Sequence, residues 1–411
     1  MEDSSSPPGP ERRRLHVVMV IQRFRPYFSG QGVQLEELSR VLVRRGADVT
    51  VVAAMRGRDA PREERIHGVS IRRLRSDLPG RGDSRLRRRL WSPTFAARTF
   101  LHLLLRAGPV DLVHVHGATD ALYAAWAFGR LRRVPVLFEM TLMGVDDPLS
   151  MQSSKHCFAG TRDAIYRRFP GYVAMSPALA QAYREAGMPE DRLRMIPQGV
   201  DVERYRPAAD RAVLRRELSV AEDEPVLVFL GSLVERKGID VLLAAWERIH
   251  RERPAARLWL VGRDRFADDP AAESFLERCL GTLSPAARAR VERFGVRGDA
   301  ERFLQAADAF LFPSRREGFG TAIIEAMACG VPCVASNVGG SRAILSGDDA
   351  GLLFEAGDAA GLAARLEQVL TQPETARRLG ERGRAAVVAH YDLERLVAGE
   401  IALLRRVAGV A

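Results

Sequence analysis

The feature that most constrains the fold is the stretch 308–340, DAFLFPSRREGFGTAIIEAMACGVPCVASNVGG. The apolar run at 309–312 predicts a buried strand. The letters EGFG then indicate a loop with two glycines, and an apolar helix begins at Thr321 and ends before Gly330. A second strand follows at 331–335. A strand, a loop, a helix and a strand in this order form a unit of an open parallel sheet, in which ligands bind at the carboxyl ends of the strands.

Two glutamates lie in this unit, one in the loop and one in the helix. Seven residues separate Glu317 from Glu325, and the helix around Glu325 is otherwise apolar. A carboxylate on a buried helix is costly unless a partner satisfies it, and sugar hydroxyls are suitable donors. The glycines and the free N–H groups that begin the helix favour a phosphate. The pair therefore favours a ligand with sugar, phosphate and ribose parts. Each glutamate alone also fits a solvated position.

The letters EGFG, the following EAMA and the downstream GG together resemble the E-x7-E motif of glycosyltransferase family 4, whose members are retaining enzymes of the GT-B class. The resemblance implies that Glu317 contacts the transferred sugar and that Glu325 holds the ribose hydroxyls of the donor. It also implies backbone contacts with the donor at Gly318, Phe319, Gly320 and Thr321. It extends over essentially all of residues 15–407.

The second half of the chain repeats the alternation of strands and helices. An apolar strand at 225–230 leads into the turn GSLVERKG and then a helix. Arg236 and Lys237 in this turn can neutralise a diphosphate leaving group, although an isolated Arg-Lys pair is more often a surface feature. Lys237 matches the family lysine, and Arg236 replaces an arginine that relatives carry where this chain has Ser232. Val296 lies in a segment that faces the base in the family.

The first half opens with the same pattern. The letters LHVVMVI at 15–21 predict a buried strand, and a helix with apolar residues at helical spacing ends at Gly46. Between them, Gly30 and Gly32 predict a turn that suits phosphate. The loop resembles the N-terminal Gly-Gly loop of the family, with Ser29-Gly30 where the pair would fall. Gly30 is therefore the candidate for backbone contact with the diphosphate or the acceptor.

The acceptor side of the predicted site is expected on the first sheet. The letters DLVHVH at 111–116 predict a strand on which His114 and His116 point the same way. Because no third ligand lies nearby in sequence, we expect no metal there. The family carries a similar Asp-x-x-His-x-His, which places His116 at the cleft edge. Many relatives have a histidine after the next strand, where this chain has Glu139. Glu139 and Asp146 are thus candidates for contact with the acceptor hydroxyl, and an ordinary polar loop is the alternative.

These units predict an α/β protein of the GT-B class, with two Rossmann-like β/α/β domains that face each other across a cleft. Residues 1–14 are expected to be a disordered tail and 15–200 the N-terminal acceptor domain. Residues 201–390 are expected to bind the nucleotide sugar. The terminal segment 391–411 is expected to be a helix that crosses back onto the N-terminal domain, as in relatives. The letters PQGVD at 197–201 resemble the family's domain switch.

The net charge and the composition limit the classes of binding partner that we expect. The formal net charge is +10, with 62 Lys+Arg against 52 Asp+Glu. No nucleic-acid motif accompanies this charge, so we expect no nucleic-acid partner. The cluster Arg81–Arg89 precedes aromatic and aliphatic residues and predicts contact with an anionic membrane surface; a helix with a solvated basic face is the alternative. The excess of arginine also fits a biased genome composition.

Other features concern location. The segment 1–14 lacks the apolar core of a signal peptide, and no apolar run is long enough to span a bilayer. Four scattered cysteines fit free thiols in a reducing compartment. We therefore expect a cytoplasmic protein with peripheral contact to the inner face of the membrane.

The expected chemistry follows from the resemblance. It implies a retaining, hexosyltransferase-type enzyme that acts on a glycan, a lipid-linked acceptor or a small molecule, in the synthesis of cell-surface polysaccharide or glycolipid. Glu317, Lys237 and Arg236 are the expected catalytic residues. The chain has no Asp-x-Asp triplet, so we expect no metal at the diphosphate. We expect no cofactor besides the nucleotide-diphosphate sugar as co-substrate.

Three other functions stay open on the sequence. A Rossmann oxidoreductase is disfavoured because the first turn lacks G-x-G-x-x-G. A non-catalytic GT-B-like binding subunit of a polysaccharide assembly complex is suggested by Ser232, Glu139 and the incomplete glycine pair at Gly30. A sucrose- or trehalose-type synthase or a phosphorylase is disfavoured by the modest length of the chain.

Overall fold

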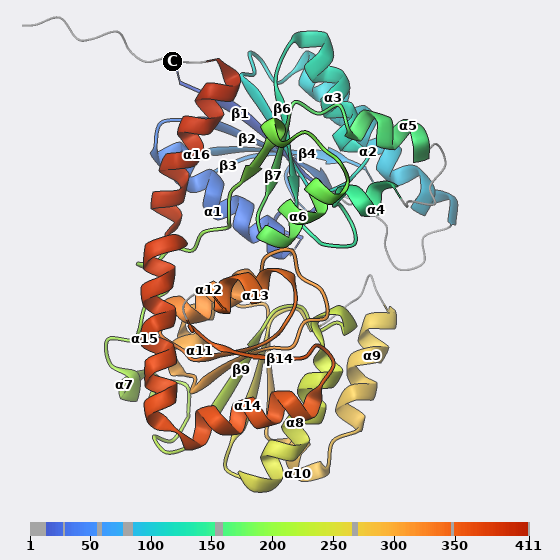
Figure 1. Cartoon of the computed structure of the whole chain (residues 1–411). Helices are drawn as coiled ribbons and strands as arrows, with labels where there is room; N and C mark the ends of the chain where they lie inside the picture. Colours follow the sequence, from blue (N-terminus) through green and yellow to red (C-terminus); the bar gives the residue numbers. More distant parts are fainter. Residues whose placement is uncertain are drawn as a thin grey trace, which may run out of the picture.

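Two separate β-sheets, one from each half of the chain, organise this computed structural model (Figure 1). The structure describes residues 14–27, 29–55, 60–76, 85–152, 159–264, 270–346 and 349–409. Residues 1–13 of the predicted tail 1–14 and the side chains of Arg81–Arg89 lie outside the described residues.

The first sheet has eight strands and is parallel except at one edge. Its strands are β1 (His16–Ile21), β2 (Asp48–Met55), β3 (Glu63–Ile66), β4 (Val69–Arg75), β5 (Leu112–His116), β6 (Val136–Met140), β7 (Gly171–Ala174) and β8 (Leu193–Met195). They follow the order β3-β4-β2-β1-β5-β6-β7-β8, and only the β3–β4 pair is antiparallel. The central strands are buried because helices cover both faces of a parallel sheet.

The helices of the first domain lie on both faces of this sheet. They are α1 (Gly30–Arg44), α2 (Arg85–Leu105), α3 (Ala121–Arg132), α4 (Pro148–Gln152), α5 (Ala159–Tyr166), α6 (Pro177–Glu185) and the short η1 (Glu190–Arg192). Helix α1 begins at a cap, since the Ser29 side chain accepts a hydrogen bond from the Gly32 N–H at 2.9 Å. The predicted turn at Gly30 and Gly32 is therefore wrong, because both residues belong to the first turn of this helix.

The second sheet has six parallel strands. They are β9 (Val226–Leu230), β10 (Arg257–Val261), β11 (Val291–Gly295), β12 (Ala309–Phe312), β13 (Cys333–Ser336) and β14 (Leu352–Phe354). Their order is β11-β10-β9-β12-β13-β14. The order reverses direction between β9 and β12, and such a switch point is where open α/β sheets bind ligands.

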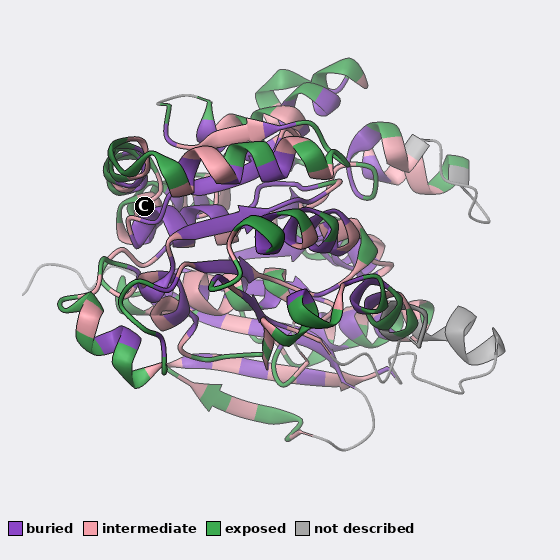
Figure 2. Ribbon diagram, turned by 90° about the horizontal axis from the view of Figure 1, so that it is seen from below, coloured by how far each residue is buried: buried purple, intermediate pink, exposed green. Residues whose placement is uncertain are grey.

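The second domain also has helices on both faces of its sheet. They are α7 (Arg211–Glu217), η2 (Glu235–Lys237), α8 (Ile239–Glu252), α9 (Pro270–Gly281), α10 (Pro285–Ala289), α11 (Ala300–Ala306), α12 (Thr321–Ala328), α13 (Gly339–Leu345), α14 (Ala359–Thr371) and α15 (Pro373–His390). Figure 2 shows that the strands are largely buried, whereas the helices expose their outer sides.

The last helix, α16 (Leu393–Ala408), leaves the second domain and packs on the first, beside α1 (Figure 1). Val200 joins the crossing segment, since its N–H donates to the Tyr391 carbonyl at 2.8 Å and its carbonyl accepts from the Leu393 N–H at 3.0 Å. Leu393, Val397 and Leu404 are buried in the same apolar cluster as β1 and α1. The predicted crossing of the terminal helix is therefore confirmed.

Two smaller expectations concern membrane spans and thiols. Among the described helices, none has both the length and the apolar character needed to cross a bilayer. Cys279, Cys329 and Cys333 are free, buried thiols, and Cys157 lies outside the described residues.

The packing of α16 yields a test of its contribution to stability. Leu404 is 1% exposed in the core between α16 and the first domain, so Leu404→Ala is expected to lower the free energy of unfolding by about 2–5 kcal/mol. The matched control is Leu105→Ala on α2, where the leucine is 72% exposed and the expected change is within about 0.5 kcal/mol. Urea denaturation measures both. Equal effects of the two substitutions would show that α16 does not contribute to the core.

Candidate active site

The Glu317 carboxylate lies where the loops after β9 and β12 meet. Its side chain is buried, and its Oε1 accepts hydrogen bonds from Lys237 Nζ at 2.6 Å, Ser314 Oγ at 2.7 Å and Arg236 Nη1 at 3.2 Å. Desolvation raises the pKa of Glu317, but the charges of Lys237 and Arg236 outweigh it and hold the pKa below its ordinary value. Glu317 is therefore an ionised carboxylate at neutral pH.

Close backbone packing brings these groups together. A Cβ on Gly238 would lie 1.9 Å from the carbonyl oxygen of Pro313, and Gly238 has a φ of +71°. Only glycine therefore lets the loop after β9 reach the end of β12. Lys237 Nζ lies 4.8 Å from the centre of the Phe312 ring, which adds a cation–π contact. Arg315, which follows Ser314 in the loop after β12, points elsewhere and pairs with Asp240 on α8.

The EGFG loop is packed tightly against its surroundings. A Cβ on Gly318 would lie 1.9 Å from the carbonyl oxygen of Thr141 in the first domain, and one on Gly340 would lie 1.9 Å from that of Phe319. The Phe319 ring meets the Tyr391 ring edge-on, with 5.6 Å between the ring centres. The loop is therefore held between the first domain, the start of α13 and the crossing segment. The glycines of the motif are required by these approaches.

The start of α12 offers hydrogen-bond donors. Within the described residues, no protein acceptor meets the backbone N–H groups of Phe319, Gly320 and Thr321. Such unpaired N–H groups at a helix start, together with the helix dipole, favour an anion. The Thr321 hydroxyl itself bonds to the Gln198 amide of the domain switch. The predicted donor-binding backbone thus lies at the junction of the two domains.

Glu325 lies one turn further along α12, and no hydrogen bond of its carboxylate occurs in the described structure. Burial raises the pKa of Glu325 to about 7, and the charge of Arg204 opposes this increase. Arg204 is held by Glu301 at 2.9 Å, with Glu37 of α1 at 3.6 Å. Lys237 acts electrostatically on both Glu325 and Glu317. The two glutamates of the motif therefore lie in the same region of the second domain.

Two other predicted donor contacts have open surroundings. Gly30 begins α1, and a Cβ added to it would meet no atom within 4 Å. The neighbouring Gly32 is the crowded one, since its Cβ would lie 2.8 Å from the Arg23 carbonyl oxygen. Val296 follows β11 and is 53% exposed. Both Gly30 and Val296 are thus accessible, and their contact with a donor stays a prediction.

The acceptor-side candidates lie on the first domain, at the ends of β5 and β6. His116 stands opposite Glu139 in the parallel register, with His116 Nδ1 3.2 Å from Glu139 Oε2. His114 Nε2 lies 3.5 Å from the same oxygen. Desolvation raises the pKa of Glu139, but the charge and hydrogen bond of His116 outweigh it and lower the pKa below its ordinary value. Burial lowers the pKa of His114 to about 3, so its ring is neutral.

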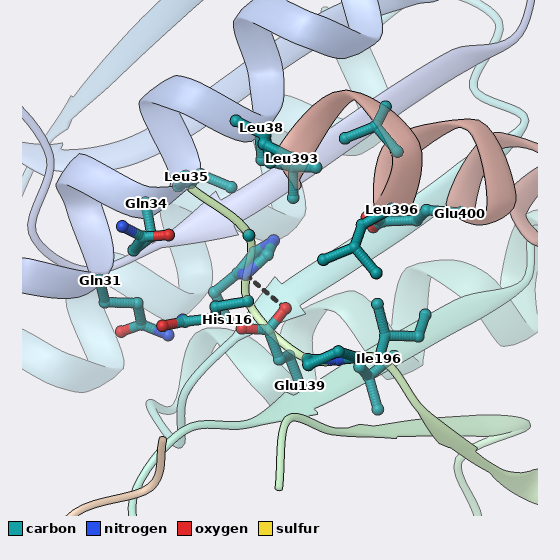
Figure 3. Close-up of a pocket in the computed structure, with 15 residues that line it drawn as sticks. Gln31, Gln34, Leu35, Leu38, His116, Glu139, Ile196, Leu393, Leu396 and Glu400 are labelled. Carbon is teal, nitrogen blue, oxygen red and sulfur yellow. Dashed lines mark ion pairs between the residues drawn. The ribbon is translucent and has the colours of Figure 1, made fainter. Parts of the chain in front are cut away.

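His116 and Glu139 border a cavity of about 40 Å³ between the sheet, α1 and α16 (Figure 3). Glu400 of α16 lines the cavity together with His116 and Glu139, and burial followed by repulsion from Glu139 raises the pKa of Glu400 to about 8. Glu139 was not expected to be a partner of the histidines, and Glu400 was not among the predicted site residues. The alignment of strand ends was a usable signal for Glu139, since neighbouring parallel strands end at one edge.

Asp146, the third acceptor-side candidate, is bound within its own loop. Its carboxylate accepts hydrogen bonds from the N–H groups of Thr141 at 2.9 Å and Leu142 at 2.8 Å, and from the Thr141 hydroxyl at 2.5 Å. Burial raises the pKa of Asp146 to about 6. These bonds shape the backbone that meets Gly318, so Asp146 helps to position the junction.

Two family profiles together match most of the chain. The Glycosyltransferase Family 4 profile matches residues 28–204, and the Glycosyl transferases group 1 profile matches residues 210–386. Among curated relatives, D-inositol 3-phosphate glycosyltransferase of Geodermatophilus obscurus is 30% identical over 400 residues, which is 93% of this chain and 86% of the relative. N-acetyl-alpha-D-glucosaminyl L-malate synthase of Bacillus anthracis is 27% identical over 70% of this chain and 72% of its own length.

Solved structures share the fold. Sucrose-phosphate synthase from Thermosynechococcus elongatus superposes with a TM-score of 0.79 at 24% identity, over 97% of this chain and all of that one. HepE of Anabaena, solved with UDP and glucose, gives a TM-score of 0.76 at 21% identity over 95% of this chain and 99% of that one. The two parallel-sheet domains, the crossing helix and these matches confirm the GT-B fold. The chain belongs to glycosyltransferase family 4, the group 1 glycosyl transferases, and is a hexosyltransferase-type glycosyltransferase.

Proposed function

We propose that this enzyme is a retaining, metal-independent glycosyltransferase that moves a sugar from a nucleotide-diphosphate sugar to an acceptor hydroxyl. The observation that carries the proposal is the Glu317 carboxylate, which Lys237 and Arg236 hold ionised beside the open N–H groups at the start of α12. An acid, two cations and a helix start at one sheet edge suit a substrate that joins a polyhydroxylated sugar to a diphosphate.

In the proposed reaction, the bond between the anomeric carbon and the diphosphate oxygen breaks. A bond from that carbon to the acceptor oxygen forms on the same face of the sugar, and the acceptor proton passes to the leaving phosphate oxygen. Lys237, Arg236 and the α12 N–H groups stabilise the charge that develops on the diphosphate. Glu317 contacts the transferred sugar. Glu325, which has no hydrogen bond in the described structure, accepts hydrogen bonds from the ribose hydroxyls.

The comparisons support a nucleotide-sugar donor and a polar acceptor. The HepE structures contain UDP with glucose, UDP alone, or UDP-glucose. Curated relatives include a lipopolysaccharide core glycosyltransferase of Rhizobium meliloti and a GDP-mannose-dependent phosphatidylinositol mannoside mannosyltransferase of Corynebacterium glutamicum. We therefore propose a glycan, lipid-linked or small-molecule acceptor and a role in cell-surface polysaccharide or glycolipid synthesis. The cytoplasmic location, the contact with the membrane and the acceptor contacts of His116, Glu139 and Asp146 stay predictions.

A thermal-shift screen against UDP, GDP, ADP and TDP and their sugars tests donor binding. One nucleotide at about 100 times its Kd is expected to stabilise the protein by about 2.7 kcal/mol and to raise its Tm by several degrees. A donor that is bound but neither transferred nor hydrolysed would instead identify a non-catalytic binding subunit. The absence of any shift would contradict the proposed donor site.

The charged cluster of Glu317, Lys237 and Arg236 yields a prediction about catalysis. Glu317→Gln and Lys237→Ala are each expected to lower kcat/KM for sugar transfer by about 10²–10³-fold, because each removes a charge that faces the reacting groups. Arg315→Ala is the matched control. Its guanidinium pairs with Asp240 instead, and both side chains are about one-third exposed, so the expected change in kcat/KM is small. Circular dichroism checks that all variants fold. Near-normal transfer by both site variants would refute the assignment.

Glu325 yields a prediction about pH. Its pKa in the folded protein, about 7, exceeds the ordinary value of 4.5, so the native state binds more protons between these values. The contribution of Glu325 to stability therefore falls as pH rises from about 4.5 to about 7. Glu325→Gln removes this loss, so the Tm of the variant is expected to match wild type near pH 4 and to exceed it above pH 7.

The same variant is expected to bind the donor nucleotide more weakly. Hydrogen bonds to a charged group contribute about 1.5–3 kcal/mol, so the affinity at pH 8 is expected to fall by about 10–100-fold. The exposed Glu374→Gln on α15 is the control for both measurements. Scanning calorimetry across pH and titration calorimetry with the nucleotide measure these effects. A variant with lower stability and unchanged affinity would contradict the proposed role of Glu325.

A further inference from the structure

Two histidines and a glutamate converge on one point beneath the terminal helix. Within the described residues, one ligand atom from each of His114, His116 and Glu139 lies within 4.8 Å of the others. All three residues are buried, and they come from the neighbouring strands β5 and β6. We propose that His114, His116 and Glu139 form a binding site for a divalent transition-metal ion, and that this ion is zinc.

The distances fit the size of such a site. Zinc binds imidazole nitrogen and carboxylate oxygen at about 2.0–2.2 Å, so neighbouring ligands around a tetrahedral ion are separated by about 3.3–3.6 Å. Glu139 Oε2 lies 3.2 Å from His116 Nδ1 and 3.5 Å from His114 Nε2. The strand register places His116 and Glu139 opposite each other, and His114 lies two residues earlier on the same face. The backbone therefore places Glu139 Oε2 at coordination spacing from a nitrogen of each histidine.

Unsatisfied nitrogens support the same conclusion. His114 is 1% exposed, and neither of its ring nitrogens has a hydrogen-bond partner in the described structure. His116 Nε2 is likewise buried without a partner. Buried polar atoms are nearly always hydrogen-bonded, so several orphans in one place require an explanation. A metal ion beside Glu139 Oε2 accounts for His114 Nε2, the orphan nitrogen that faces this oxygen at 3.5 Å, because a neutral imidazole donates a lone pair to a cation.

Charge balance points the same way. Glu139 is buried beside the cavity, and no Lys or Arg is among the described residues that line it. Carboxylates out of water need a cation or a metal ion as partner. The cavity of about 40 Å³ has room for a water as the fourth ligand. Imidazole and carboxylate ligands suit zinc among the common metals.

The proposed ion is separate from the sugar-transfer chemistry, which needs no metal at the diphosphate. It changes the roles of two residues, because His116 and Glu139, which were predicted to lie on the acceptor side, would hold the ion instead. It would also fix β5 to β6 beneath α1 and α16. The proposed metal site is therefore additional to the proposed function, and the experiment that tests it measures metal content instead of sugar transfer.

The experiment uses the full chain without an affinity tag, purified from zinc-supplemented culture and dialysed against metal-free buffer. Elemental analysis is expected to find about one zinc ion per chain with a Kd below about 1 µM. His114→Gln and Glu139→Gln are expected to weaken binding by more than about 100-fold, since losing a ligand costs more than losing an outer-shell partner. The matched control is His102→Gln, because His102 on α2 is also buried with an unpartnered Nε2 but belongs to no such cluster among the residues that the structure describes.

Cobalt substitution tests the site in wild-type protein, so the result does not depend on whether a variant folds. Wild-type protein loaded with Co²⁺ is expected to show the visible absorption of a four-coordinate ion, and a chelator is expected to lower the Tm of wild type and His102→Gln but not that of His114→Gln. Wild type that retains no zinc and gives no such absorption would overturn the proposal, as would equal metal loss in His102→Gln. Sugar transfer by a metal-free wild type would leave the proposed function intact.

Discussion

The burial of the Glu317 carboxylate determines how the loops around it are arranged. An ionised group out of water needs close partners, and here both cations belong to the loop after β9, whereas the carboxylate belongs to the loop after β12. These loops meet because β9 and β12 are neighbours in the sheet, although more than 70 residues separate them in sequence. The contact of Glu317 with Lys237 and Arg236 therefore requires this strand order. The same switch point leaves the start of α12 facing the first domain.

The second constraint is the closeness of the two domains. Gly318 meets the Thr141 backbone, Thr321 bonds to Gln198, and the Phe319 ring packs on Tyr391 of the crossing segment. The loop that carries the first glutamate is thus fixed by elements of both halves of the chain. A donor held at this loop would have the first domain as its immediate neighbour, which explains how one molecule can present donor and acceptor to each other.

Much of this arrangement could be predicted because the motifs stand at strand ends. Glu317, Lys237 and Arg236 each follow an apolar strand, and parallel strands bring such positions to one edge. Gly30 and Gly32 were assigned to a turn, whereas Ser29 caps a helix that begins with them. The spacing of the glycines alone did not distinguish a turn from a helix start. Glu400 could not be predicted, because it belongs to α16, which is remote in sequence from the first sheet. Only the way in which α16 packs on the first domain determines which of its side chains reach the cavity.

The route of the terminal helix has a consequence for biosynthesis. A ribosome makes the first sheet early but reaches α16 only after about 200 further residues, which takes about 10–40 s at usual rates of elongation. Throughout that interval, the apolar surface that Leu393, Val397 and Leu404 later cover has no partner from its own chain. Domains commonly fold as they emerge, yet here the nascent first domain must wait for the second to be made. The order of the elements along the chain therefore favours a chaperone that covers this apolar surface until α16 has been made.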